Sequence, residues 1–355
     1  MLDIALYVCS YKNMRWNNLS ATGPPGALPL ALPEAVVRTF DTPGFAGMTF
    51  YEIHAKSIIS RVPSASSMPF QWTINPYRGC SHACVYCFAR NTHTYLDLDS
   101  GDDFDRKVVV KVNAAALLRR ELASASWSGD HIAMGTNVDC YQRAEGRYGL
   151  MRGILRELVE RANPFSILTK GTLITRDLDL IQRGAAVSRV GISFSVGFVN
   201  EDLWRSVEPG TPSPRRRLDA VRRFSDAGIP VSVLMAPILP GLSDSDASVE
   251  ATVAAIAAAG AVNVTPLALH LRPGAREWYS AWLARLHPEL VDRYRELYGK
   301  GSYLSKAYQR ELTARVRTVA RRHGLNRPRL TEHRQLDPAP PAGERPDRAE
   351  QLTLL

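Results

Sequence analysis

The chain has 355 residues, of which 45% are hydrophobic and 22% are charged. This balance is typical of a globular protein with a large buried core, and it excludes a fibrous or fully disordered chain. No apolar run reaches the length of a membrane-spanning helix, so no membrane partner is expected. The 44 basic residues outnumber the 35 acidic ones, which gives a net charge of +9. An anionic partner is compatible with this surplus but is not identified by it.

The first 65 residues are expected to form an irregular extension, because prolines recur through their middle part. Met14 is a plausible alternative start, so residues 1–13 are expected to be dispensable and Cys9 is not counted as a ligand. Arginines cluster in two later segments of the chain, and each cluster is compatible with either a solvated helix face or a surface that binds nucleic acid. These places are Arg215, Arg216, Arg217, Arg222 and Arg223, and the segment from Arg315 to Arg329.

From about Gln71 short apolar strands alternate with longer helical segments, which predicts an α/β fold with a parallel sheet and crossover helices. Helix end signals support this reading: Ser213 with Pro214 opens one helix, and Gly228 follows its end. Ser245 and Gly260 bracket another helix in the same way. The predicted strands are Trp72 to Pro76, Ile132 to Gly135, Ser166 to Thr169, Val190 to Val196, Val231 to Ala236 and Asn263 to Leu269.

Three cysteines, Cys80, Cys84 and Cys87, follow the first predicted strand with three and then two residues between them. Three thiolates leave one position open on a metal centre, as catalytic sites do, so a catalytic metal site is predicted. A zinc site would need His82 or His93 as a fourth ligand, at a spacing that zinc fingers do not use. A disulfide is disfavoured because the chain has five cysteines and no signal peptide, which indicates a reducing compartment.

The cysteine spacing, with Tyr86 before the last cysteine, resembles that of the radical SAM superfamily. The longer strings Asn-Pro-Tyr-Arg-Gly-Cys80 and Tyr86-Cys-Phe-Ala-Arg resemble its spore photoproduct lyase-like, or "DNA repair photolyase", branch. The resemblance implies a partial (β/α)6 barrel over residues 66–275 and a 4Fe-4S cluster whose open iron binds S-adenosylmethionine. It also implies reductive cleavage to a 5′-deoxyadenosyl radical, an electron donor such as flavodoxin or ferredoxin, and a cytoplasmic enzyme.

In a β/α barrel the reactive groups lie where the strands end, and the resemblance assigns cofactor roles to residues at these ends. The backbone at Gly135 and Thr136 is expected near the methionyl amine, although the double glycine of the family is missing here. Lys170 is expected to meet the carboxylate of S-adenosylmethionine, or to be an ordinary solvated lysine. Ser193 and Ser195 share one strand face and are expected to bind the ribose hydroxyls, or to lie on an exposed face.

The turn at Gly241 and Asp244 resembles the loop that packs on adenine, although a simple strand-to-helix turn explains the same residues. Asp139 is expected near the cavity, with helix capping as the alternative. Cys140 is either a hydrogen donor to a product radical or a small buried hydrophobic residue. Glu208 and Arg217 resemble a signature of the family, but the sequence assigns them no chemistry.

Residues 276–330 are predicted to be helical, with aromatic residues that either close the open barrel or stack on bases. The segment 331–355, rich in Pro, Ala, Glu and Arg, is predicted to be disordered. Repair or modification of a nucleic acid is the substrate reading that the resemblance implies. A radical transformation of a peptide or small molecule, and a non-catalytic protein stabilised by a metal, stay open as alternatives.

Overall fold

The computed structural model describes residues 19–20, 35–63 and 68–325, and its largest element is a seven-stranded sheet within this part of the chain. Six of these strands run parallel, and β4 (Ile59–Arg61) adds an antiparallel edge beside the first of them. All six strands predicted from the sequence are confirmed as members of this sheet, which has the order expected of a partial barrel. They are β5 (Trp72–Ile74), β8 (Ile132–Met134), β9 (Phe165–Thr169), β10 (Val190–Ser195), β11 (Val231–Ile238) and β12 (Asn263–Ala268).

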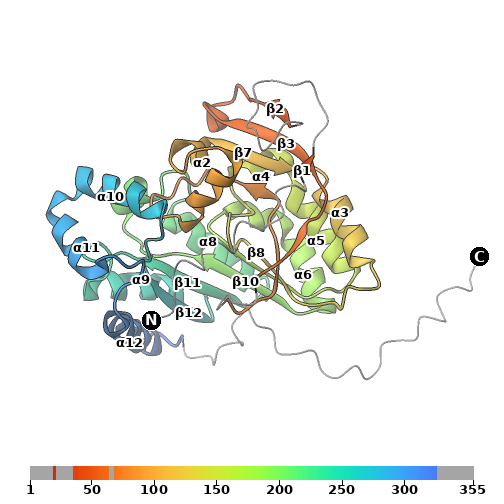
Figure 1. Cartoon of the computed structure of the whole chain (residues 1–355). Coiled ribbons are helices and arrows are strands. Elements are labelled where there is room, and N and C mark those ends of the chain that lie inside the picture. The colour runs from red at the N-terminus through yellow and green to blue at the C-terminus, as the bar shows by residue number, and fades with distance from the viewer. Residues whose placement is uncertain (1–18, 21–34, 64–67, 326–355) are drawn as a thin grey trace, which may run out of the picture.

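Helices connect the parallel strands and cover one side of the sheet (Figure 1). The expected end signals are present, since the Ser213 side chain accepts a hydrogen bond at the start of α8 (Pro214–Asp226) and Ser245 does so at α9 (Asp246–Ala258). The main apolar core lies between the strands and these helices. The other helices are α3 (Ala114–Leu122), α4 (Arg143–Tyr148), α5 (Leu150–Glu160), α6 (Leu178–Val187) and α7 (Glu201–Val207).

A second, smaller sheet occupies one end of the molecule beside α2 (Asp102–Arg106) and α4 (Figure 1). Its central strand β3 lies within the segment that the sequence analysis expected to be irregular, and that expectation is wrong for the described part. The reason is non-local: β3 pairs in parallel with β7, which comes about fifty residues later in the chain. The strands are β1 (Leu19–Ser20), β2 (Val36–Arg38), β3 (Thr49–Ala55), β6 (Tyr77–Arg78) and β7 (Lys107–Lys111).

The aromatic residues after β12 pack against the barrel, as one of the two readings expected. Tyr279, Trp282, Tyr294 and Tyr298 are buried in a cluster that also contains Leu269 and residues of the cysteine loop. Side chains so enclosed are unavailable for stacking on bases, while Tyr303 remains 54% exposed. The helices that carry them are α10 (Ala275–Leu286), α11 (Val291–Tyr298) and α12 (Lys306–Arg322).

Several expectations fall outside the described residues. These are the alternative start at Met14 with the dispensable residues 1–13, the proline-rich stretch that includes Pro24, and the disordered tail 331–355. Among the helices that are described, none has both the length and the apolar character needed to cross a membrane.

Candidate active site

The three cysteines lie on residues 79–90, which follow β6, end in the first turn of the short helix η4 (Phe88–Leu96) and are called here the cysteine loop. It begins at Gly79, whose positive φ of 78° and close contact with a β7 carbonyl exclude a side chain. Turns within the loop bring the thiols to one region, since the Cys87 amide donates to the Cys84 carbonyl at 3.2 Å. Cys80 and Cys84 are buried, and Cys87 is partly exposed.

Gln142, the residue before α4, holds the beginning of the cysteine loop. Its side-chain oxygen accepts from the Ser81 amide at 2.9 Å, and its side-chain nitrogen donates to the Gly79 carbonyl at 2.9 Å. The side chain is fully buried, so both bonds are shielded from water. Two opposed bonds from one amide fix the backbone immediately around Cys80.

Arg90 holds the other half of the loop. Its guanidinium donates to the Cys84 carbonyl at 3.0 and 3.2 Å, and it pairs with the Asp105 carboxylate at 2.9 Å. The arginine is completely buried and stacks over the rings of Trp278 and Phe104. This places a fixed positive charge directly behind a loop that carries three thiols.

Burial raises the pKa of all three thiols, because a thiolate loses hydration in the interior. Within the described residues, no three His, Cys, Asp or Glu side chains converge closely enough to hold a single metal ion. The histidines weighed as zinc ligands have other partners: His93 Nε2 lies 2.8 Å from the Lys107 carbonyl, and His82 Nδ1 lies 3.4 Å from Asp139. The three thiols fit a cluster, in which each thiolate binds a different iron.

Asp139 joins the ends of β8 and β9. Its carboxylate accepts from the Tyr141 amide at 2.8 Å, from the Thr169 hydroxyl at 2.6 Å and from the Lys170 amide at 2.6 Å. The first of these bonds closes a local turn, and it is not the helix cap that was the alternative, because the N-cap of α4 is Gln142. Neighbouring Cys140 is buried in the main apolar core, so the structure puts it among hydrophobic side chains.

Lys170 and Ser195, chosen separately from the sequence, lie in contact at the ends of β9 and β10. The Lys170 ammonium donates to the Ser195 hydroxyl at 2.9 Å and lies 5.7 Å from the centre of the Tyr86 ring. Ser195 in turn donates to the Ala236 carbonyl at 2.8 Å. Ser193 lies two residues earlier on the same face of β10 and is half-buried.

Glu208 and Arg217 form a buried ion pair beside Lys170. The sequence analysis noted these two residues as a family signature without a chemical role, and the structure shows that they contact each other. The Glu208 carboxylate also accepts the hydroxyl hydrogen of Tyr86 and lies 4.0 Å from the Lys170 ammonium. Although burial opposes it, the charges of Arg217 and Lys170 hold the pKa of Glu208 below its ordinary value. The cysteine loop and the ends of β9 and β10 are thereby connected through one carboxylate.

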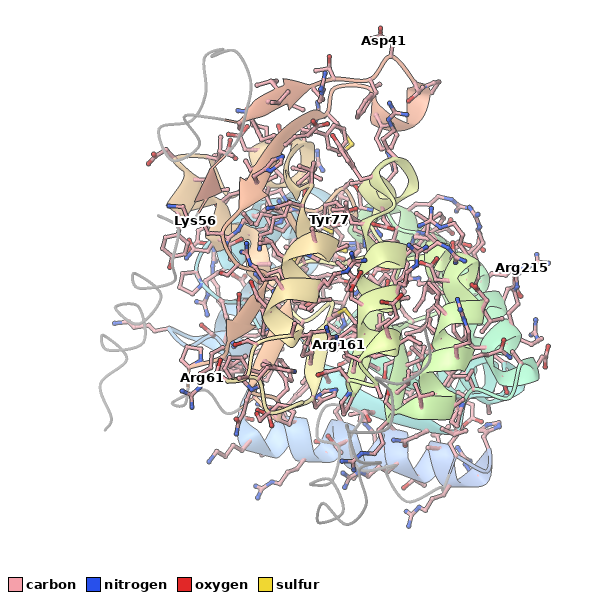
Figure 2. The ribbon with its side chains drawn as sticks, turned by 90° about the vertical axis from the view of Figure 1, so that its right-hand side faces the viewer. Asp41, Lys56, Arg61, Tyr77, Arg161 and Arg215 are labelled. Atoms are coloured by element: carbon pink, nitrogen blue, oxygen red, sulfur yellow. The ribbon has the colours of Figure 1, made fainter. Side chains whose placement is uncertain are left out.

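Arg217 was grouped with the surface arginines of α8, and that grouping is wrong. Its guanidinium is 1% exposed and donates to the Ser195 carbonyl at 2.8 Å. Arg215, two residues earlier, lies on the outside of the molecule (Figure 2). The local sequence could not separate the two, because the ion-pair partner of Arg217 precedes the helix.

Two glycines expected near the cofactor have clear structural roles. Gly135 has φ of +73°, and a Cβ there would lie 1.8 Å from the Leu168 carbonyl oxygen, so only glycine allows this approach between β8 and β9. The adjacent Thr136 is half-buried. The Gly241 amide donates to Asp244 at 2.7 Å, and Asp244 also accepts from Tyr308 of α12. The Gly241 turn is therefore held by the C-terminal helices.

Comparison with known proteins gives matches in sequence and in structure. Residues 74–251 match the family model described as the radical SAM superfamily. An uncharacterized protein of Mycobacterium tuberculosis (strain ATCC 25618 / H37Rv) is 48% identical over 336 residues, which cover 93% of this chain and 97% of that protein. One of Methanocaldococcus jannaschii is 31% identical over 54% of this chain and 69% of its own length.

Among solved structures, a spore photoproduct lyase complexed with dinucleoside spore photoproduct aligns with a TM-score of 0.59. The alignment covers 90% of this chain and 91% of that one at 16% identity. A mutant of such a lyase with bound AdoMet and the dinucleoside photoproduct gives a TM-score of 0.57 at 16% identity, over 74% and 76% of the two chains. At this level of identity the likeness concerns the fold.

Proposed function

This chain belongs to the radical SAM superfamily and is a radical SAM enzyme, and we propose that Cys80, Cys84 and Cys87 hold its 4Fe-4S cluster. The observation that carries the proposal is the set of three thiols, two of them buried, on one loop that follows the first barrel strand β5 and the short strand β6. When bound, the cluster and S-adenosylmethionine supply reductive cleavage of the sulfonium and a 5′-deoxyadenosyl radical. The residues around the loop position these cofactors.

The loop is suited to a cluster because its backbone is fixed from both sides before any iron binds. Gln142 holds the segment before Cys80, and Arg90 holds the Cys84 carbonyl. Burial raises the pKa of the Cys87 thiol, and the positive charge of Arg90 offsets part of this rise. Preorganisation of this kind lowers the entropy lost when the ligands are ordered.

We propose that S-adenosylmethionine lies across the ends of β8 to β11. Lys170 is the cation proposed for its carboxylate, since the ammonium donates a hydrogen bond to the Ser195 hydroxyl and lies 4.0 Å from Glu208 within the described part of the chain. Ser193 and Ser195 offer hydroxyls on the adjoining strand, and Tyr86 provides a ring beside Lys170. The backbone at Gly135 and Thr136, and the turn at Gly241, complete the proposed contacts.

We assign Asp139 a positioning role, since all its strong bonds go to the protein. Cys140 is proposed as a core residue, because it is 1% exposed and belongs to the main apolar core. The electron donor is proposed to be a flavodoxin or a ferredoxin and the compartment the cytoplasm, where a reducing environment keeps such thiols free.

For the substrate we propose a nucleic acid, which the enzyme repairs or modifies. Two observations support this class: the net charge of +9 and the fold similarity to a lyase that was solved with a dinucleoside photoproduct. A peptide or small-molecule substrate is the second candidate, favoured by the burial of the aromatic residues that could otherwise stack on bases. Transformation of an oligonucleotide, but not of peptides, by the reduced enzyme would decide for the first.

The cluster assignment is tested by the iron and sulfide content after anaerobic reconstitution. Cys84→Ala should lose most of the iron, because two thiolates cannot retain the cluster that three hold. Cys140→Ala is the matched control, since it removes a buried thiol outside the cysteine loop and should keep its iron. Equal iron in wild type and Cys84→Ala would refute the ligand assignment.

A further inference from the structure

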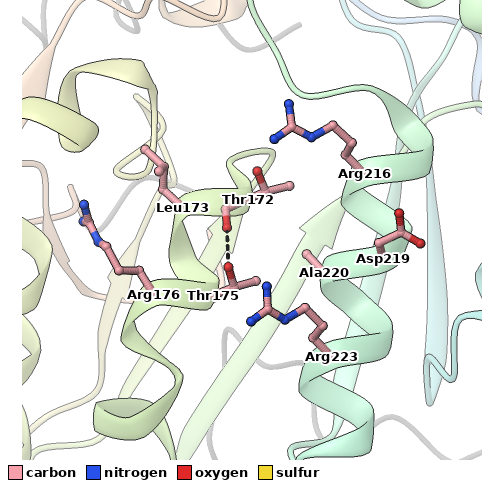
Figure 3. Close-up of a pocket in the computed structure, with 8 residues that line it drawn as sticks. All are labelled: Thr172, Leu173, Thr175, Arg176, Arg216, Asp219, Ala220 and Arg223. Atoms are coloured by element: carbon pink, nitrogen blue, oxygen red, sulfur yellow. Dashed lines mark hydrogen bonds between the residues drawn. The ribbon is translucent and has the colours of Figure 1, made fainter.

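An open groove of about 410 Å³ lies on the outer wall of the barrel, between the short helix η5 (Thr172–Asp177) and α8 (Figure 3). Its lining includes the apolar residues Leu173 and Ala220, and the other residues that line it are polar or charged. The proposed cofactor contacts leave this groove unused. Its shape suits an extended ligand better than a compact one, because the groove follows two neighbouring helices and is open to solvent.

Two arginines of α8 face this groove and have no acidic partner among the described residues. Arg216 and Arg223 are exposed, and their guanidinium groups make no hydrogen bond or ion pair with any residue that the structure describes. Seven positions separate them, which puts them on one helix face about 10 Å apart along the axis. Figure 3 shows both directed toward η5.

The other charges at the groove are already paired. Arg176 donates to the buried Glu145 carboxylate at 2.9 Å, and Asp219 pairs with Arg222 at 3.0 Å. A surface that keeps two cations unpaired, while its neighbours are neutralised, attracts an anion from solution. Arginine is suited to phosphate in particular, because its planar fork donates two hydrogen bonds at once.

One end of the groove is formed by residues that adjoin the proposed active site in sequence. Thr172 comes two residues after Lys170, and its neighbour in the groove, Arg216, precedes the arginine that donates to the Ser195 carbonyl. The segments that line this end of the groove are therefore continuous in sequence with those that carry Lys170 and contact Ser195. This continuity distinguishes the groove from an unrelated patch of surface charge.

We propose that this groove binds the sugar–phosphate backbone of the nucleic-acid substrate, next to the nucleotide that enters the active site. Arg216 and Arg223 each contact a phosphate, and the Thr172 hydroxyl adds a donor near the mouth. Phosphate contacts of this kind fix register and orientation and carry no sequence information. The inference rests on the proposed nucleic-acid substrate, and it adds where the strand lies.

The test measures binding of a short fluorescein-labelled single-stranded oligonucleotide to the reconstituted enzyme by anisotropy over a range of salt. Arg216→Gln with Arg223→Gln should weaken binding about tenfold and lower the slope of log K against log salt by about 1.4, from two lost phosphate contacts. Arg215→Gln with Arg295→Gln is the matched control, since it removes the same charge outside the groove. Its slope should stay near that of wild type.

A second variant tests whether binding changes in the opposite direction when a negative charge is removed from the groove. Asp219→Asn removes the only acidic side chain among the described residues that line the groove, and it raises the net charge of the chain by one, so it should tighten oligonucleotide binding. Equal weakening by the groove and control pairs, or no effect of any variant, would overturn the groove assignment and leave the substrate class standing. Failure of the wild-type enzyme to bind any oligonucleotide would overturn both.

Discussion

Replacement of Glu208 by Gln tests the buried network that connects the cysteine loop to the strand ends. The carboxylate is fully buried and lies against Arg217, which is 1% exposed. Gln can still accept hydrogen bonds, but it leaves the guanidinium charge without a partner. Breaking a buried ion pair from one side costs about 3–5 kcal/mol. With an unfolding entropy of about 2.1 cal/mol/K per residue, this cost lowers Tm by about 4–7 °C.

The assay is thermal unfolding of the reconstituted protein under anaerobic conditions. Glu201→Gln is the matched control, since it removes the same charge from an exposed pair on α7 and should change the free energy of unfolding by less than about 0.5 kcal/mol. The double variant Glu208→Gln, Arg217→Met should recover part of the loss, because it also removes the stranded charge. Equal Tm values for Glu208→Gln and Glu201→Gln would refute the reasoning.

Three further changes follow from the structure. Gly135→Ala should lower the free energy of unfolding by more than about 3 kcal/mol in chemical denaturation, because the new Cβ would meet the Leu168 carbonyl. Gly228→Ala, at a glycine that also has positive φ but an open surrounding, should lower it by about 1 kcal/mol. Burial and a nearby arginine lower the pKa of His131 to about 4. The free energy of unfolding should therefore fall by up to about 3 kcal/mol as pH drops from about 6.5 to 4, because the unfolded state takes up the proton first. His131→Gln should make the free energy of unfolding depend less on pH in this range. Gln142→Leu should reduce the iron retained after reconstitution, measured per chain, because the start of the cysteine loop loses two hydrogen bonds.

Each of these has a clear contrary result. Similar costs for the two glycine variants would mean that the strand ends can separate. If His131→Gln leaves the pH dependence of the free energy of unfolding unchanged, other titrating groups cause the loss of stability in acid. Full iron in Gln142→Leu would mean that the cluster itself, rather than the buried amide, orders the loop.

The sequence was most informative where the signal is local. Each barrel strand is a short apolar run between turn residues, and the helix caps at Ser213 and Ser245 were readable within four residues. Lys170 and Ser195 were each identified from the sequence at a strand end, but their contact was not predicted; it arises because the carboxyl ends of neighbouring parallel strands meet at one edge.

Contacts between distant segments were not readable. Tyr86 and Glu208 are 122 residues apart, and no pattern in either segment indicates that they meet. The strand β3 was missed for the same reason, since it depends on pairing with β7. The turn at Gly241 is held by Tyr308, whose contact with Asp244 spans 64 residues.

The central claim is that the three cysteines support reductive cleavage of S-adenosylmethionine, and the most direct measurement is the 5′-deoxyadenosine formed by reconstituted enzyme with dithionite. We expect the product from wild type and from Cys140→Ala, and none from single Ala variants of Cys80, Cys84 or Cys87. Product from any of those three variants, or its absence from wild type that contains a full cluster and an oligonucleotide substrate, would contradict the account.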